Sequence, residues 1–202
     1  MASKAVHSVD VQTMRIVAGT LRGRPIIAPE RGALRPTADR VRESVFNILA
    51  HGIEDFELTG ARVVDMFAGT GALGFEALSR GAAFCVFIED DADARAIIRR
   101  NVEAFGLTGQ TRIFRRDATD LGNAGGRDVA NLMFIDAPYG KALATKALAS
   151  AAKGNWFAPG AVIVCEDRAG ETIEPPASIT QFDKRSYGDT QILFLRNRVA
   201  GS

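Results

Sequence analysis

Short apolar runs alternate with amphipathic segments through the middle of the chain. The apolar runs occupy residues 62–66, 84–88, 112–115, 131–135 and 161–165. Between them, apolar positions recur at helical spacing near residues 72–80, 91–105 and 141–153. Strand-length runs that alternate with helices are typical of a parallel sheet covered on both faces. The pattern therefore predicts an α/β core.

The two ends of the chain depart from this rhythm. Residues 15–26 contain short apolar runs broken by Gly and Pro, which predicts a small hairpin, and a helical pattern follows. Near the C terminus, "ITQFDKRSYGDTQILFLR" has two strand-like runs around "SYGD", which predicts a hairpin that adds an antiparallel edge. We expect three regions: a flexible leader (1–13), a basic N-terminal hairpin and helix (14–50), and the main domain (51–202).

Composition limits the class of protein. At 202 residues with 47% hydrophobic positions, the chain can bury one good core. No apolar stretch approaches the roughly 20 residues of a membrane span, and a secretory signal pattern is absent, so we expect a cytoplasmic protein without a membrane partner. Cys85 and Cys165 lie in apolar runs and His7 and His51 lack zinc-ligand spacing. We therefore expect buried reduced thiols and no metal site.

Charge is distributed unevenly although the net charge is only +1. Residues 15–42 contain seven arginines, no lysine and two acidic residues, while the remainder from residue 43 onward is mildly acidic. A solvated basic face is one reading of this segment. The exclusive use of arginine favours phosphate recognition, because the guanidinium fork can grip two phosphate oxygens.

The segment "VVDMFAGTGALG" (63–74) carries the first chemical motif. Its glycines follow the first predicted core strand and open a helix, which suits a ligand that approaches the amino end of that helix. Glu89 ends the next predicted strand, where a carboxylate can bind ribose hydroxyls. Alone, this pattern fits a dinucleotide enzyme as well as a methyltransferase, and a glycine turn for packing is a third reading.

A carboxylate separates these possibilities. Asp65 precedes Gly69 by four residues, and a negative charge there repels a pyrophosphate and attracts an amino-acid ammonium group. This favours S-adenosylmethionine over a nicotinamide dinucleotide. Asp117 follows the third predicted strand and can receive an adenine amino group, or it can simply cap a loop or pair with a nearby arginine.

The segment "FIDAPYG" (134–140) ends the fourth predicted strand with a carboxylate and an aromatic ring. Because the carboxyl ends of parallel strands share one edge of the sheet, Asp136 is expected beside Asp65 and Glu89. A carboxylate that accepts the N–H bonds of an exocyclic base amine turns its lone pair towards a methyl donor. Tyr139 can stack on the base. The other reading is an ordinary Asp-Ala-Pro turn with a packing ring.

These segments together carry a family resemblance. "DMFAGTGALGFEALSRGA" and "DAPY" resemble the class of S-adenosylmethionine-dependent amino-methyltransferases. More narrowly, "MRIVAGTLRGRPI", "RPTADRVRESVFNIL" and "YGDT" resemble the bacterial RsmD family, which methylates a guanine N2 amine in 16S ribosomal RNA; the similarity runs from about residue 14 to 196. The resemblance implies a Rossmann-like class I methyltransferase fold with a seven-stranded, mostly parallel sheet.

The resemblance also implies roles for individual residues. The catalytic loop would comprise Asp136, Ala137, Pro138 and Tyr139. The cofactor contacts would be Asp65, Phe67, Gly69, Gly71, Glu89, Asp117 and Ala118. The arm would bind RNA through Arg22, Arg24, Arg35 and Arg40. The implied partners are small-subunit ribosomal RNA and assembled or partly assembled 30S particles, and we expect a monomer.

The chain departs from the family pattern at one position and leaves alternative functions open. Ala137 stands where the family has a first proline, which would fix φ in the catalytic loop. Pro138 still biases Ala137 towards an extended backbone. Alternatives are an enzyme of the same class that acts on DNA adenine or protein glutamine, a non-catalytic RNA-binding assembly factor, and, last, a nicotinamide-dependent oxidoreductase.

Overall fold

The structure is a computed structural model that describes residues 14–29, 36–139 and 142–198. The predicted leader (1–13) and Arg35 lie outside the described residues. The helices are α1 (Pro36–His51), α2 (Ala72–Ser79), α3 (Ala92–Phe105) and α4 (Leu143–Lys153), with a 3-10 turn at Thr108–Gln110. The strands are β1 (Arg62–Met66), β2 (Phe84–Ile88), β3 (Thr111–Phe114), β4 (Ala130–Asp136), β5 (Phe157–Arg168), β6 (Ile179–Tyr187) and β7 (Thr190–Asn197).

The seven strands form one sheet in the order β3-β2-β1-β4-β5-β7-β6. The five strands from β3 to β5 pair in parallel, whereas β7 pairs antiparallel with both β5 and β6. The predicted mostly parallel sheet with an antiparallel C-terminal hairpin is therefore confirmed. Because the chain order reverses between β1 and β4, this is the point where a ligand crevice is expected at the carboxyl ends of the strands.

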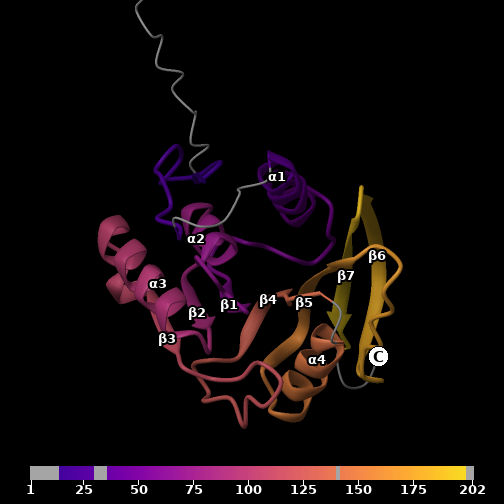
Figure 1. The fold of residues 1–202 in the computed structure, drawn as a ribbon. Helices are drawn as coiled ribbons and strands as arrows, with labels where there is room; N and C mark the ends of the chain where they lie inside the picture. The colour runs from indigo at the N-terminus through magenta and orange to yellow at the C-terminus, as the bar shows by residue number, and fades with distance from the viewer. Residues whose placement is uncertain (1–13, 30–35, 140–141, 199–202) are drawn as a thin grey trace, which may run out of the picture.

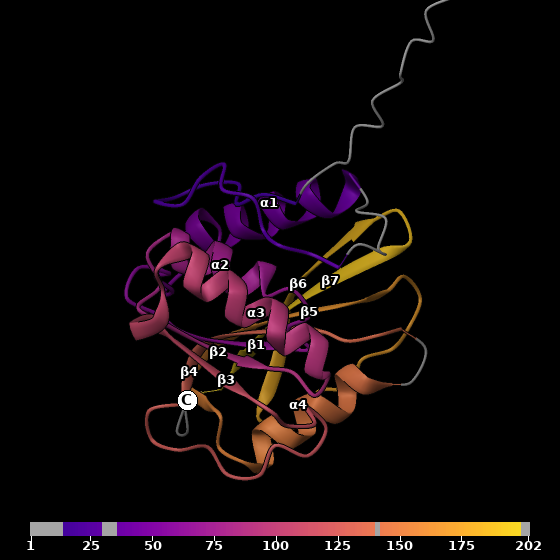
Figure 2. The ribbon, with the colours of Figure 1, turned by 60° about the vertical axis from the view of Figure 1, so that its left-hand side comes forward.

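Helices cover both faces of the sheet (Figures 1 and 2). One core layer joins α1, α2 and α3 to alternate residues of the strands, such as Val63, Leu132 and Val162. The other layer packs α4 against the intervening residues, such as Val64 and Met133. Successive side chains of a strand point to opposite faces, so near-continuous apolar runs serve both layers at once. This explains why the central runs are almost entirely apolar, with Asp65 of β1 as the buried exception.

The C-terminal hairpin ends in a turn of two residues, Gly188 and Asp189, because Tyr187 pairs directly with Thr190. Gly188 has φ of +60°, which glycine adopts without strain. The expected "SYGD" connection is thus shorter than the sequence suggested, since Ser186 and Tyr187 belong to β6. The hairpin extends the sheet at the edge furthest from β3 and brings its turn to the carboxyl end of β5.

The N-terminal arm forms a short, irregular hairpin that packs on α2. An antiparallel bridge joins Arg15 and Pro25, and the backbone N–H groups of Ile16 and Ile26 donate to the carbonyls of Arg24 (3.0 Å) and Met14 (2.8 Å). Ile16 and Ile26 are both buried in the core. Gly19 has φ of +83°, and a Cβ there would lie 1.8 Å from the carbonyl oxygen of Ser79. Glycine at this position therefore lets the arm approach the last turn of α2.

A buried carboxylate anchors the arm. Glu76 of α2 is fully buried and accepts hydrogen bonds from the backbone N–H groups of Val17 (2.8 Å) and Ala18 (3.0 Å). It also binds the side chain of Arg80 at 2.7 Å and lies 3.9 Å from Nε of Arg42 in α1. One side chain thus joins the arm, α1 and α2, which places α1 over the crevice at the carboxyl ends of the strands.

Candidate active site

A cavity of about 510 Å³ lies at the carboxyl ends of β1, β4 and β5. Its volume is in the range of small-molecule sites, about 300–1,000 Å³. Five of the residues predicted from the sequence line it: Asp65, Phe67, Gly69, Asp136 and Tyr139. The structure therefore brings the glycine loop after β1 and the loop after β4 to one place, as the strand-end argument predicted.

The glycine loop turns through left-handed backbone conformations. Phe67, Gly69 and Gly71 have φ of +54°, +55° and +80°. At Gly69 a Cβ would meet no atom closer than 3.9 Å, so the loop is open on that side. At Gly71 a Cβ would lie 2.6 Å from the ring of Phe75, so this glycine is also required for packing inside the protein. The sequence alone could not separate these two reasons for a glycine.

Asp65 is buried at the base of the cavity and accepts a hydrogen bond of 2.9 Å from the backbone N–H of Gly74. Burial raises the pKa of Asp65 well above its ordinary value; the bond from Gly74 opposes this rise, and the carboxylates of Asp136 and Glu89 add to it. A positively charged ligand group would stabilise the ionised form. Asp65 is therefore suited to an ammonium group in the cavity.

Glu89 joins the loop after β2 to the glycine loop. Its Oε2 accepts a hydrogen bond from the backbone N–H of Gly69 (2.8 Å), and its Oε1 accepts one from the N–H of Asp91 (2.9 Å). Glu89 does not line the cavity itself, but its hydrogen bond holds Gly69, which does. Since a carboxylate has about four acceptor positions, two remain that could bind ligand hydroxyls.

Asp136 is the last residue of β4 and faces the cavity beside Glu166 of β5. Solvent reaches the residue, yet the surrounding protein is dense enough to desolvate the carboxylate. This desolvation, with a smaller contribution from the charge of Glu166, raises the pKa of Asp136 to about 7. The group therefore changes charge near neutral pH, the range in which a carboxylate can take up and release a proton efficiently.

Tyr139 is 41% exposed and lines the cavity. Its hydroxyl donates to Oε1 of Glu166 at 3.1 Å and lies 3.3 Å from Oγ1 of Thr190 in β7. These contacts tether the far end of the ring to two strands. The position is suitable for stacking on a flat ligand.

Other predicted residues lie outside the lining of the cavity. Ala137 is buried and Pro138 is exposed, and both connect Asp136 to Tyr139. Asp117 is exposed and accepts hydrogen bonds of 2.7 Å from both the N–H and the hydroxyl of Thr119, which lower its pKa. This is the loop-capping arrangement that the sequence left open, and the adenine contact stays a prediction. Ala118 is buried in the core layer beside α4.

The cavity also contains residues that the sequence analysis missed. From β5 and the C-terminal hairpin come Glu166, Tyr187, Asp189, Thr190 and Ile192, and from the arm and α1 come Met14, Val41, Arg42 and Val45. The hydroxyls of Tyr187 and Ser44 lie 2.6 Å apart, which joins the C-terminal hairpin to α1. The only sequence signal for Glu166 was its place at the end of the fifth predicted strand.

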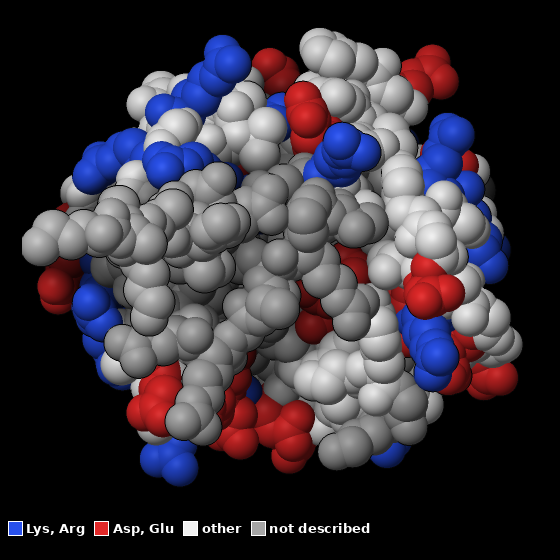
Figure 3. All heavy atoms as spheres, turned by 45° about the horizontal axis from the view of Figure 1, so that its top comes forward, with Lys and Arg blue, Asp and Glu red and all other residues white. Residues whose placement is uncertain are grey.

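The arginines of the arm have different environments. Arg22, Arg24 and Arg40 are all exposed, but the guanidinium of Arg24 also donates to the carbonyl of Ala104 and lies 5.1 Å from the centre of the Phe105 ring. On the face that carries the arm, Lys and Arg side chains are spread around the periphery, and acidic side chains show near the centre (Figure 3).

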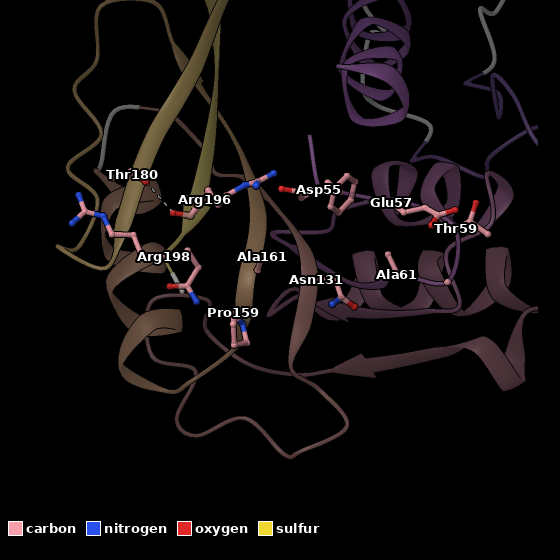
Figure 4. A pocket seen from close by; sticks show the side chains of 14 residues that line it. Asp55, Glu57, Thr59, Ala61, Asn131, Pro159, Ala161, Thr180, Arg196 and Arg198 are labelled. Atoms are coloured by element: carbon pink, nitrogen blue, oxygen red, sulfur yellow. Dashed lines mark hydrogen bonds between the residues drawn. The ribbon is translucent and has the colours of Figure 1, made fainter. Parts of the chain in front are cut away.

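A second cavity, of about 640 Å³, lies at the opposite ends of the parallel strands. It is lined by the amino ends of the parallel strands and the end of β7, including Ala61, Asn131 and Arg196 (Figure 4). The side chain of Arg196 donates to the carbonyl of Glu54 at 2.6 Å. Although this cavity is larger, none of the predicted site residues lines it, and ligands of α/β sheets bind at the carboxyl ends of strands. The smaller cavity is therefore the candidate active site.

No described helix is long and apolar enough to cross a membrane. Among the described residues, no group of three or more His, Cys, Asp or Glu side chains is arranged to hold a metal ion.

The sheet order, the two covering layers and the glycine loop define a Rossmann-like class I methyltransferase fold. In agreement, the solved structure of "Putative methyltransferase yhhF from Escherichia coli" superposes with a TM-score of 0.79 at 30% identity, covering 93% of this chain and 99% of that one. The chain belongs to the family described as Conserved hypothetical protein 95, whose model matches residues 14–196.

Curated relatives of the chain carry a common name. The ribosomal RNA small subunit methyltransferase D of Escherichia coli K12 is 37% identical over 163 residues, which cover 81% of this chain and 78% of that protein. The protein of the same name from Haemophilus influenzae is 32% identical over 177 residues, which cover 87% and 89%. The recognised family is thus confirmed, and the protein is a methyltransferase.

Proposed function

We propose that this protein transfers a methyl group from S-adenosylmethionine to the exocyclic N2 amine of a guanine in small-subunit ribosomal RNA. The observation that carries the proposal is the meeting of Asp65, Asp136 and Tyr139 in one cavity at the strand ends. The names of the relatives support a ribosomal RNA substrate. A chain of this size has little surface for reading long RNA, which favours an assembled or partly assembled 30S particle that presents a shaped target.

The residues of the glycine loop fit the cofactor. S-adenosylmethionine supplies an electrophilic methyl group on a sulfonium. The Asp65 carboxylate, next to the open side of the loop at Gly69, would hold its ammonium group, and the free acceptor positions of Glu89 would hold ribose hydroxyls. Asp117 and Ala118 would contact the adenine only if their loop approaches the cavity when the ligand binds.

The residues after β4 would prepare the base. Tyr139 would stack on the guanine and hold its plane, a contact worth about 1–3 kcal/mol. The Asp136 carboxylate and a neighbouring backbone carbonyl would accept the two amine N–H bonds, so that the nitrogen lone pair points at the methyl group. When the N–C bond forms and the S–C bond breaks, the amine becomes positively charged and gives a proton to Asp136. Its pKa of about 7 suits this transfer.

The test is transfer of a labelled methyl group to naked small-subunit RNA and to partly assembled particles, both from cells that lack this protein, with the modified nucleoside identified by mass spectrometry. We expect N2-methylguanosine, and we expect Asp136→Ala to abolish it. Asp183→Ala is the matched control, because Asp183 pairs with Arg185 on the exposed edge strand, away from the cavity. A methylated adenine, a methylated glutamine, or no transfer despite cofactor binding would refute the proposal.

A further inference from the structure

Glu166 of β5 is the direct neighbour of the proposed catalytic carboxylate. In the parallel pairing of β4 and β5, Asp136 and Glu166 occupy matching positions, and both side chains line the cavity with Tyr139. Adjacent strands lie about 4.8 Å apart. The two carboxylates therefore line the same cavity at the spacing of neighbouring strands.

The contacts of Glu166 leave it able to accept more hydrogen bonds. Its Oε1 accepts from the hydroxyl of Tyr139, which is also 3.3 Å from Thr190. A carboxylate can accept about four hydrogen bonds, so the bond from Tyr139 orients the group without saturating it. If Tyr139 stacks on the base, the adjacent Glu166 carboxylate is positioned near an edge of that base.

The charges of Asp136 and Glu166 determine which groups the edge of the base must present. Desolvation raises the pKa of Glu166, and its charge contributes to the raised pKa of Asp136. Two close carboxylates disfavour simultaneous ionisation unless donors lie between them. A ligand edge with N–H groups opposite both carboxylates would stabilise the pair, and an edge with a lone pair opposite one of them would be repelled.

Purine bases differ in this respect. Guanine presents an N1–H donor directly beside its N2 amino group, whereas adenine and 2-aminopurine have an N1 lone pair beside their amino groups. Resting on the proposed function, we propose that Glu166 accepts the N1–H of the target guanine while Asp136 accepts its amine, so that Glu166 selects guanine over purines with an unprotonated N1. Sites that hydrogen-bond a substrate N–H discriminate strongly against analogues that lack it.

The experiment compares guanine with 2-aminopurine at the mapped target position. The analogue keeps the 2-amino group but lacks the N1–H, and splinted ligation places it in the small-subunit RNA. For the wild-type enzyme we expect methylation of guanine to be about five- to 150-fold faster. For Glu166→Ala we expect slower transfer to guanine. The ratio of the guanine rate to the 2-aminopurine rate should fall to about two or less. Glu166→Gln, which keeps an uncharged acceptor, should recover part of the ratio.

Tyr139→Phe is the matched control for the positioning contact. It removes the hydrogen bond that orients Glu166 but keeps the carboxylate, so it should slow transfer to both bases and lower the ratio less than Glu166→Ala does. Equal cofactor affinity in all variants confirms that the cavity is intact. A Glu166→Ala ratio equal to that of the wild type overturns only this inference, whereas absence of N2-methylguanosine from the wild-type reaction overturns the proposed function with it.

Discussion

The carboxylate of Asp65 accepts a hydrogen bond of 2.9 Å from the backbone N–H of Gly74, so one side chain both lines the cavity and holds the first turn of α2. Replacing Asp65 with Asn keeps an oxygen for Gly74 but removes the charge that would bind the cofactor ammonium. We expect affinity for S-adenosylmethionine to fall about ten- to 150-fold, the value of a charged hydrogen bond. Isothermal titration calorimetry measures it.

Asp65→Ala separates the two roles of the side chain. It leaves the buried N–H of Gly74 without an acceptor, so we expect an additional loss of about 1–3 kcal/mol in the free energy of unfolding. Urea denaturation of the two variants measures this difference. Equal cofactor affinity in the wild type and Asp65→Asn would show that the ammonium is held elsewhere.

The pH dependence of turnover follows from the carboxylate pair. Because Asp136 must be ionised to accept the amine protons, methyl transfer should rise with pH through its pKa of about 7. In Glu166→Gln the second negative charge is absent, so the midpoint should move to lower pH. Single-turnover rates between pH 5 and 9, at saturating cofactor, measure both midpoints. Identical profiles would mean that another group controls the rate.

Stability should respond to the same titration. The pKa of Asp136 is higher in the folded protein than its ordinary value of 3.8, so the folded state binds the proton more tightly. Relative to Asp136→Asn, the wild type should be most stable below about pH 4 and should lose that advantage as the pH rises to about 7. Denaturation midpoints of both proteins across this range check the sign, and an increase in relative stability with pH would contradict it.

The catalytic loop offers a gain of function. Ala137 is buried between Asp136 and Pro138, and proline at this position would restrict the loop in the unbound protein. Restriction of this kind is worth about 0.4–1 kcal/mol, so Ala137→Pro should raise turnover about two- to fivefold if the loop limits the reaction. Single-turnover methyl transfer measures it. Unchanged or lower turnover would show that the loop is not limiting.

The fold was predictable because its signals are local. The apolar runs at 62–66 and 84–88 coincide with β1 and β2, since buried parallel strands need apolar residues at consecutive positions. Asp65 and Asp136 could be placed together because parallel strands end at a common edge. The cofactor loop was likewise visible in its glycines.

The rest of the site depends on tertiary pairing. Thr190 and Asp189 reach the cavity only because β7 pairs antiparallel with β5, and no local pattern fixes that register. Glu76 was missed because its partners, the backbone N–H groups of Val17 and Ala18, are almost 60 residues away in the chain. Asp117 was named from the sequence, but its role was left open. A carboxylate at that position fits both a loop cap and a ligand contact.

Glu76 should be critical for stability. Glu76→Gln removes the charge that compensates the buried Arg42 and the partly buried Arg80 side chains, and breaking a buried ion pair costs about 3–5 kcal/mol. We expect a loss of this size in the free energy of unfolding by urea. Asp183→Asn breaks an exposed pair with Arg185 and should cost less than about 1 kcal/mol. Similar losses in the two variants would mean that Glu76 does not anchor the arm.

Two arginines of the arm should differ in what they bind. Both are exposed, but the guanidinium of Arg24 contacts the carbonyl of Ala104 and the ring of Phe105. Arg22→Gln should weaken RNA binding and reduce the slope of log K against log salt concentration by about 0.7–0.9, the loss of one phosphate contact, with unchanged stability. Arg24→Gln should instead lower the free energy of unfolding by about 1 kcal/mol and change the salt dependence less. Filter binding at several salt concentrations, with urea denaturation of both variants, measures this. An equal change in salt dependence would place both side chains on the RNA, because only loss of a phosphate contact alters the number of released counterions.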